Sequence, residues 1–252
     1  MPEQQNIIHF RGVTVCYGRL TALRDITLEI PCGSSTAVLG GNGAGKSTLL
    51  RAVLGWQPLA SGEIRIGDDH AEHVRPRLAY VPQRHSVDWD FPITVRGIVE
   101  MGRYQALGWW KTFREADRLT VARSLEAMEL KDLAERQINA LSGGQQQRAF
   151  LARALAQEAH VFLLDEPFSG LDKPAQDLLG HTIRRLANAG NLLIVSHHDL
   201  RTVRELFDQV IFINGELVAL GETDQVFTTE NIQKTFHTHI FSGTVHEHGL
   251  AL

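Results

Sequence analysis

STAVLGGNGAGKSTLL (residues 35–50) decides the fold, because a short apolar strand passes through a glycine-rich turn directly into a helical pattern. The turn GGNGAGKST (40–48) fits G-x-x-x-x-G-K-[ST], a pattern that binds phosphate when it lies between a strand and a helix. Successive backbone N–H groups curl around phosphate oxygens in such a turn, and the helix N-terminus adds a favourable dipole. The alternative is a glycine turn that only caps an ordinary helix.

The residues of this loop have separate expected tasks. We expect Lys46 to reach the β- and γ-phosphates of a nucleotide, Ser47 to ligate Mg²⁺, and Thr48 to support the phosphates. The loop therefore predicts a site for ATP with Mg²⁺. The remaining ATP-binding positions are expected to act mainly through their backbone, and they are Gly40, Gly41, Asn42, Gly43, Ala44 and Gly45.

A second segment, HVFLLDEP (160–167), supplies the carboxylates that such a site needs. An apolar strand ends at Asp165, which places this carboxylate where it can hold the Mg²⁺ shell. Glu166 points away from Asp165 and is expected to polarise the attacking water. Two solvated acids after a strand are the alternative, and the presence of the glycine loop upstream argues against them.

Three single residues are weaker candidates for the same site. Gln83, in AYVPQR, follows a short strand and can reach Mg²⁺ and the lytic water through its amide. His198, in VSHHDL, can contact the γ-phosphate, although His197 competes with it and a helix cap near Asp199 explains the segment equally well. Tyr17, in VCYGR, can stack on adenine or simply be a half-buried tyrosine at a strand end.

A second glycine-rich helix start occurs in LSGGQ (141–145). Its bare backbone again allows a ligand to approach closely. Since loop 40–48 already provides the phosphate site of one chain, we expect this segment to complete the site of a second copy of the chain. Its residues are Leu141, Ser142, Gly143, Gly144 and Gln145, of which Ser142 and Gly144 are expected to donate to the γ-phosphate.

Composition limits the class of protein. The net charge is −4 with both signs interspersed, so nothing predicts a nucleic-acid partner. The longest apolar runs, such as NLLIV (191–195), fall short of the roughly 20 residues that a membrane-spanning helix needs. The N-terminal MPEQQNIIHF lacks the features of a signal peptide. We therefore expect a soluble chain that meets a membrane only through a partner.

The order of patterns predicts an α/β architecture. Strand-like segments at 7–30 indicate antiparallel hairpins, and apolar runs at 160–165 and 191–196 indicate parallel strands covered on both faces. The helical spacing between these two runs predicts a strand–helix–strand unit and a parallel core. A helical lobe is expected as an insert over about 84–158, inside a domain of residues 1–230.

These motifs together resemble the nucleotide-binding subunit of ABC transporters. Loop 40–48, Gln83, LSGGQ, LLDEP, SGLD (169–172) and the histidine before Asp199 follow one another in the family's order. The resemblance implies a RecA-like P-loop NTPase core with an antiparallel β subdomain and an inserted helical subdomain. It also implies a head-to-tail dimer with ATP at the interface, at the cytoplasmic face of the cell membrane.

The resemblance also implies roles for single residues. Glu166 takes the role of catalytic base and His198 that of the switch histidine, while Asp172 communicates across the dimer. Gly41 replaces a more usual proline, and Gly170 stands where alanine is frequent. Neither departure removes a donor or puts ATPase activity in doubt.

A narrower resemblance concerns VPQRHSVDWDFPITVRGIVEMGRYQALGWWK (81–111). It is similar to ATPases of importers for manganese, zinc or iron chelates that work with an extracytoplasmic metal-binding protein. Manganese is the first expectation, then zinc or chelated iron. In that family this stretch meets the permease, so Trp89, Phe91, Trp109 and Trp110 are either apolar anchors for it or core residues of the helical lobe.

Other functions remain as alternatives. A soluble ABC ATPase acting on ribosomes or DNA usually has paired cassettes or a coiled-coil insertion, and this chain has neither. An efflux ATPase uses the same motor. Asp88 and Asp90, which flank Trp89, are expected to be solvated or to face a partner rather than to bind metal.

The last residues, 231–252, are expected to form a loosely held tail. Two histidine pairs in it could bind a divalent transition metal and report its cytoplasmic level. A polar tail with incidental histidines is the alternative. The four residues are His237, His239, His246 and His248.

Overall fold

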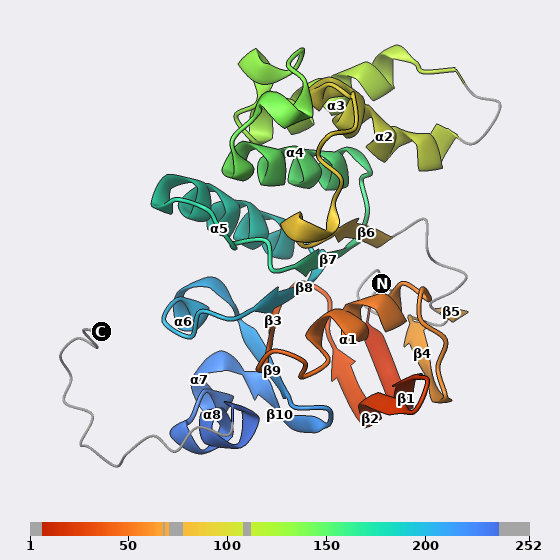
Figure 1. Ribbon diagram of the computed structural model, residues 1–252, viewed down its shortest axis with the longest axis vertical. Helices are drawn as coiled ribbons and strands as arrows, with labels where there is room; N and C mark the ends of the chain where they lie inside the picture. Colours follow the sequence, from red (N-terminus) through yellow and green to blue (C-terminus); the bar gives the residue numbers. More distant parts are fainter. Residues whose placement is uncertain (1–6, 68, 71–77, 108–111, 237–252) are drawn as a thin grey trace.

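The computed structural model describes residues 7–67, 69–70, 78–107 and 112–236. Two sheets and a group of helices make up this part of the chain (Figure 1). The larger sheet has the strand order β10-β9-β3-β8-β7-β6, and the smaller has the order β2-β1-β4-β5. The parallel core, the antiparallel unit and the helical unit predicted from the sequence are all confirmed.

The larger sheet is parallel except at one edge. Strand β3 pairs with both β8 and β9, and β7 pairs with β8 and β6, all in parallel, while β10 runs antiparallel to β9. Every residue of β3, β7 and β8 is buried, which explains their continuous apolar sequences. The bounds are β3 Ser35–Leu39, β6 Leu78–Val81, β7 Val161–Asp165, β8 Leu192–His197, β9 Gln209–Ile213 and β10 Leu217–Glu222.

The smaller sheet is antiparallel and alternates buried with more exposed residues, as expected for a sheet covered on one face. Helix α1 (Lys46–Val53) shares one apolar core with residues of both sheets, including Ile8, Leu49 and Ile194. The phosphate loop therefore leads into a helix that is held on both sides. The strands are β1 Ile8–Tyr17, β2 Leu20–Ile30, β4 Ser61–Ile66 and β5 Asp69–His70.

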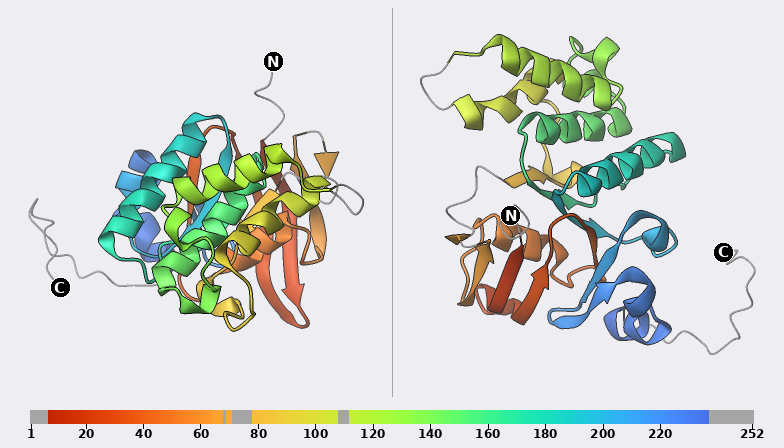
Figure 2. Two further views of the ribbon diagram at one scale, coloured as in Figure 1. Left: turned by 90° about the horizontal axis from the view of Figure 1, so that it is seen from above. Right: turned by 180° about the vertical axis from the view of Figure 1, so that it is seen from behind.

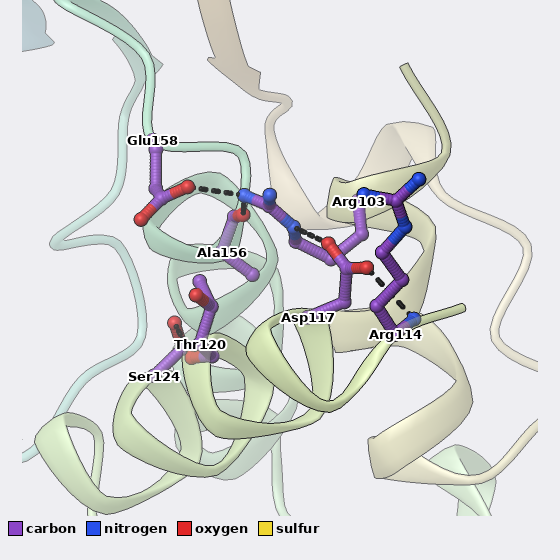
Figure 3. A network of polar contacts seen from close by, with 7 residues as sticks. All are labelled: Arg103, Arg114, Asp117, Thr120, Ser124, Ala156 and Glu158. Carbon is purple, nitrogen blue, oxygen red and sulfur yellow. Dashed lines mark hydrogen bonds and ion pairs between the residues drawn. The ribbon is translucent and has the colours of Figure 1, made fainter. Parts of the chain in front are cut away.

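Three helices form the helical unit, α2 (Val95–Leu107), α3 (Glu115–Ala127) and α4 (Gly143–Ala156), and both views of Figure 2 place them together. Arg103 of α2 links them: its Nε donates to Asp117 of α3 at 3.0 Å, and its Nη1 donates to the Ala156 carbonyl of α4 at 2.8 Å (Figure 3). Nη1 also pairs with Glu158. The partly buried guanidinium thus connects all three helices of the unit. Short 3₁₀ turns at Lys131–Leu133 and Ile138–Ala140 connect α3 to α4.

Strand β6 is an edge of the larger sheet, and α4 supplies partners for its outward carbonyls. Arg153 Nη2 donates to the Tyr80 carbonyl at 2.7 Å, and Gln157 Nε2 donates to the Leu78 carbonyl at 2.7 Å. Arg153 also places its guanidinium 4.7 Å from the centre of the Phe150 ring. The helical unit is therefore attached to the core along this edge strand.

The C-terminal part corrects one expectation. Helix α8 (Thr229–Phe236) packs on β9 and β10, with Thr235 buried and Ile232 and Phe236 in contact with the core. Residues 231–236 therefore belong to the folded domain, and the predicted boundary at residue 230 falls inside a helix. The remaining helices are α5 (Lys173–Asn188), α6 (Val203–Leu206) and α7 (Thr223–Val226).

Candidate nucleotide-binding site

A cavity of about 340 Å³ lies at the phosphate loop. Residues 41–48 line it together with Tyr17, Leu20 and Ala22, and Gln83 and Glu166 also contribute to the lining. Segments that are distant in sequence are thus brought to the carboxyl ends of the parallel strands, where α/β sheets bind ligands. Tyr17 has 40% of its surface exposed, so its ring is available for contact with a base.

The loop needs glycine at the start of α1. Gly45 is the N-cap of the helix and has φ +99°, a conformation that favours glycine. A Cβ there would lie 2.5 Å from Leu23 Cδ2 and 2.9 Å from the Ala22 carbonyl oxygen. No side chain caps this helix, so its first N–H groups remain free for a ligand.

Lys46 lies folded over its own loop. Its Nζ donates to the Gly40 carbonyl at 2.8 Å and to the Gly41 carbonyl at 3.1 Å, and the residue is buried. Burial lowers the pKa of this ammonium, while the negative charges of Glu166 and Asp165 act in the opposite direction. A phosphate in the cavity would offer the lysine a charged acceptor in place of two neutral ones.

The predicted Mg²⁺ ligands meet in space. Ser47 Oγ donates to Asp165 Oδ1 at 3.1 Å, although the two residues are 118 positions apart in the chain. A hydroxyl and a carboxylate are hard oxygen donors of the kind that Mg²⁺ prefers. The residues present therefore fit a Mg²⁺ ion together with phosphate oxygens, and Gln83 lines the same cavity.

Two further residues hold Asp165, and the sequence analysis missed both. Ser196 Oγ donates to Asp165 Oδ1 at 2.6 Å and accepts from the Glu166 N–H at 2.7 Å. Tyr80 Oη lies 3.5 Å from Asp165 Oδ2, and burial followed by the charge of Asp165 raises the pKa of this tyrosine to about 12. In the sequence, Ser196 stands out only as a polar residue at the end of an apolar strand. Its contact with Asp165 becomes visible only in the structure, where β7 and β8 pair in parallel with these two residues opposite each other.

The two adjacent histidines have different surroundings. His198 is exposed and its Nδ1 lies 3.9 Å from Glu166 Oε2, whereas His197 is buried and its Nε2 bonds Thr202 Oγ1 at 2.8 Å. Burial lowers the pKa of His197 to about 4, so this imidazole is neutral at physiological pH. The geometry therefore favours His198 over His197 as the histidine that acts beside Glu166.

Glu166 adopts an unusual backbone conformation. Its φ is +48°, in the left-handed region that residues other than glycine seldom occupy. The Ser196 hydroxyl, which accepts the Glu166 N–H, helps to hold it there. Strain of this kind often occurs where a side chain is directed toward a site.

The second glycine-rich helix start is structured by its own chain. Ser142 is the N-cap of α4 and accepts the Gln145 N–H at 3.4 Å, while Gln145 Oε1 accepts the Ser142 N–H at 3.0 Å. Segment 141–145, called the signature segment below, is absent from the lining of the phosphate cavity. Leu141 is buried in the core, which leaves Ser142, Gly143 and Gly144 at the helix end.

Asp172 also caps a helix. Its Oδ1 accepts the Ala175 N–H at 3.0 Å at the start of α5, and Gly170 just before it has φ +72°. The glycine that replaces alanine at position 170 thus occupies a backbone conformation that suits it.

The structure places the remaining predicted residues in different surroundings. Trp89 packs against Phe150 with ring centres 5.2 Å apart, whereas Phe91 has 60% of its surface exposed. Both line an apolar groove of about 230 Å³ together with Ile98, Met101 and Arg153. Asp88 Oδ1 accepts the Asp90 N–H within the same turn. Trp109, Trp110, His237, His239, His246 and His248 lie outside the described residues, so the histidine tail stays a prediction.

Within the described part of the chain, no helix has the length and apolar character needed to cross a bilayer.

The sequence profile of the ABC transporter family matches residues 23–169. The manganese transport ATP-binding protein MntB of Bacillus subtilis (strain 168) is 44% identical over 230 residues, covering 91% of this chain and 92% of the relative. The zinc transport ATP-binding protein TroB of Treponema pallidum (strain Nichols) is 43% identical, with coverage of 91% and 86%.

Solved structures show the same likeness. A metal-chelate type ABC transporter in an inward-facing conformation has a TM-score of 0.80 at 29% identity, covering 92% of this chain and 89% of the other. The dimeric cassette MJ0796 has a TM-score of 0.75 at 25% identity, with coverage of 85% and 98%.

Proposed function

This chain belongs to the ABC transporter family of ATP hydrolases, and from that premise we propose that it powers uptake of a transition metal through a separate permease. In this proposal two copies bind two ATP molecules head to tail, each between the phosphate loop of one copy and the signature segment of the other. The observation that carries it is that Lys46, Ser47 and Glu166 line one cavity, with Asp165 hydrogen-bonded to Ser47 and the signature segment absent from the lining.

ATP is held by groups that the cavity already presents. The free N–H groups at the start of α1 and the Lys46 ammonium receive the phosphates, and Thr48 supports them. The Tyr17 ring lies at the rim of the cavity and stacks on adenine. The neutral carbonyls that Lys46 now contacts are weaker partners than a phosphate, so the lysine turns toward the bound nucleotide.

Ser47, Asp165 and Gln83 would hold Mg²⁺. When bound, the ion neutralises charge that develops on the β- and γ-phosphate oxygens. Ser196 and Tyr80 keep the Asp165 carboxylate in place through its two oxygens.

Glu166 acts as the base that orients and polarises the attacking water. Glu166 and Gln83 both line the cavity, and Gln83 positions the same water through its amide. His198 Nδ1 lies 3.9 Å from Glu166 Oε2, and this histidine contacts the γ-phosphate as the switch histidine. Asp172, at the start of α5, carries the state of one site to the other across the dimer.

A second copy completes each site. Ser142 and Gly144 of that copy donate to the γ-phosphate, with Leu141, Gly143 and Gln145 forming the rest of the segment. The likeness to a dimeric cassette supports this arrangement. Closure on ATP and opening after hydrolysis then drive the permease between its access states.

Relatives support the choice of a transition metal as the transported ion. MntB and TroB are named for manganese and zinc transport, and the similar transporter structure is of the metal-chelate type. We place manganese first, then zinc or chelated iron, delivered by an extracytoplasmic metal-binding protein. The permease docks at the apolar groove that contains Trp89 and Phe91, and this contact holds the subunit at the cytoplasmic face of the membrane.

The dimer is tested with Glu166→Gln, which keeps the site's shape but removes the base. We expect ATP with Mg²⁺ to shift this variant from monomer to dimer in size-exclusion chromatography, while hydrolysis falls at least about 100-fold. A variant that stays monomeric at saturating ATP contradicts the shared site.

Cargo and direction are tested after co-purification of the membrane partner. Vesicles reconstituted with the ATPase and ATP in the lumen should accumulate Mn²⁺ from the outer solution, with Zn²⁺ and an iron chelate as parallel arms and Lys46→Ala as the inactive control. Movement of metal in the opposite direction would favour an efflux ATPase, and association with ribosomes or DNA without a permease would favour the soluble class.

A further inference from the structure

Arg84, the residue directly after Gln83, touches the start of the signature helix of the same chain. Its Nε lies 3.3 Å and its Nη2 3.1 Å from Oε1 of Gln146 on α4, so two donors of one guanidinium meet one acceptor. Gln146 is buried, and its own Nε2 donates to the Ile138 carbonyl at 3.1 Å. The acceptor is therefore fixed, and the contact defines where the arginine lies.

Gly143 provides an independent sign of the same contact. A Cβ on this residue would lie 2.8 Å from Arg84 Cζ and 2.9 Å from Arg84 Nε, so the guanidinium rests against bare backbone. By contrast, a Cβ on Gly144 would meet only Leu171 Cδ2, at an ordinary 3.5 Å. A side chain at the first glycine of the signature segment would therefore displace the Arg84 guanidinium, whereas one at the second would displace nothing within this chain.

The backbone around Arg84 is held as firmly as its side chain. Trp89 Nε1 donates to the Arg84 carbonyl at 2.8 Å, and the Trp89 ring packs on Phe150 of α4. Ser86 donates to the Gln83 carbonyl through both its N–H, at 3.0 Å, and its hydroxyl, at 2.7 Å. The short 3₁₀ turn Arg84–Ser86 therefore connects Gln83 to the signature helix through hydrogen-bonded and packed residues.

The opposite end of α4 is attached by other contacts. Arg103 ties α2 and α3 to the last turn of α4 (Figure 3), and Arg153, in that same turn, ties α4 to β6. At the start of α4, the Arg84 contact links the signature helix to the turn that follows Gln83, a residue of the ATP cavity.

We propose that Arg84 is a positioning residue, which orients the signature segment of its own chain for the ATP site of the partner copy. The inference rests on the proposed function, since it assigns a task to the contact of Arg84 with Gly143 and Gln146 at the start of the signature helix. Arg84 does not line the cavity of its own chain. Its loss should therefore weaken closure of the dimer and turnover, but leave the binding of ATP to a single chain unchanged.

The test measures three quantities on Arg84→Ala: affinity of the monomer for a fluorescent ATP analogue, kcat and KM for ATP, and the ATP-driven dimer in a Glu166→Gln background. We expect monomer affinity within about twofold of the parent, kcat about tenfold lower, and about tenfold more protein needed to form the dimer. Arg84→Lys keeps one donor for Gln146 and should recover part of the dimer. The matched control is Arg96→Ala, which removes an arginine of the same helical unit that pairs with Glu135, and it should change none of the three quantities.

Gln146→Met keeps the side-chain length, removes both the acceptor for Arg84 and the donor to the Ile138 carbonyl, and remains informative if Arg84→Ala does not fold. It should reproduce the Arg84→Ala defect, and the double variant should be no worse than either single variant. Unchanged dimerisation, equal loss of monomer affinity, or additive defects would each overturn the role of Arg84. If Glu166→Gln alone fails to dimerise with ATP, the proposed function fails instead, so the two failures are distinguishable.

Discussion

The helices α1 and α4 both begin with glycine-rich sequences, but different side chains surround the two helix ends. At α1 the cap is Gly45, and no side chain makes a capping hydrogen bond. Lys46, Ser47 and the carboxylates of Asp165 and Glu166 lie close to this helix end. At α4 the cap is Ser142 in a complete capping box, and the residues packed on the helix end are Arg84 and Leu171. The first end has the chemistry of a reaction site, and the second has only donors.

The difference explains why one chain needs both. In the proposed function, a triphosphate at α1 would meet a cation, metal ligands and a base, whereas the signature segment of the same chain is absent from the cavity lining. The α4 end supplies donors and no competing carboxylate, which is what the outer face of that triphosphate requires. The following changes test the contrast, from the largest expected effect to the smallest.

Ser142→Arg places a bulky cation at the α4 end. We expect ATP binding by the single chain to persist and turnover to fall at least about 1000-fold, because the donors can no longer approach the partner's phosphate. Steady-state hydrolysis and nucleotide binding, measured on the same preparation, check this. Undiminished hydrolysis would mean that the two ends do not share a site.

Lys46→Ala removes the cation from the α1 end. Nucleotide affinity should fall about 100-fold, since a charged partner of the phosphates is lost while the backbone donors remain. Equilibrium binding of a fluorescent ATP analogue measures the change. Ser142→Ala serves as the comparison at the other end and should leave this affinity unaltered in the monomer.

Gly45→Ala challenges the backbone of α1. The positive φ and the 2.5 Å approach to Leu23 Cδ2 should cost about 2 kcal/mol of unfolding free energy. Gly41→Ala is the matched control, because a Cβ there meets nothing within 4 Å. Urea unfolding of both variants decides the point, and equal stabilities would refute the strain.

Ser142→Ala also tests the cap of α4 by stability alone. Loss of the Ser142 side-chain acceptor should lower the unfolding free energy by about 1 kcal/mol, whereas Ser142→Gly should cost only a few tenths. The same urea experiment applies. An Ala variant as stable as the parent would mean that the capping box contributes nothing.

The sequence predicted those parts of the site whose chemistry is local. Lys46 and Ser47 lie in a strand–turn–helix pattern, and Asp165 ends an apolar strand. Each pattern spans only a few consecutive residues, so it can be recognised in the sequence alone. The parallel core followed from buried strands separated by helical spacing.

The rest depended on register and packing. Ser196 meets Asp165 only because β7 and β8 pair in one particular register, and Arg84 meets Gln146 across 62 residues. Helix α8 was missed because few of its side chains are buried, so its polar sequence resembles a tail. Contacts of this kind leave no periodic mark in the sequence.

The side chains that cover the edge strand β6 have a consequence for the solubility of the chain. An edge strand with unpaired carbonyls can pair with strands of other molecules and so cause aggregation. Arg153 and Gln157 donate to the Tyr80 and Leu78 carbonyls of this edge, so the helical unit also protects the core sheet against such pairing.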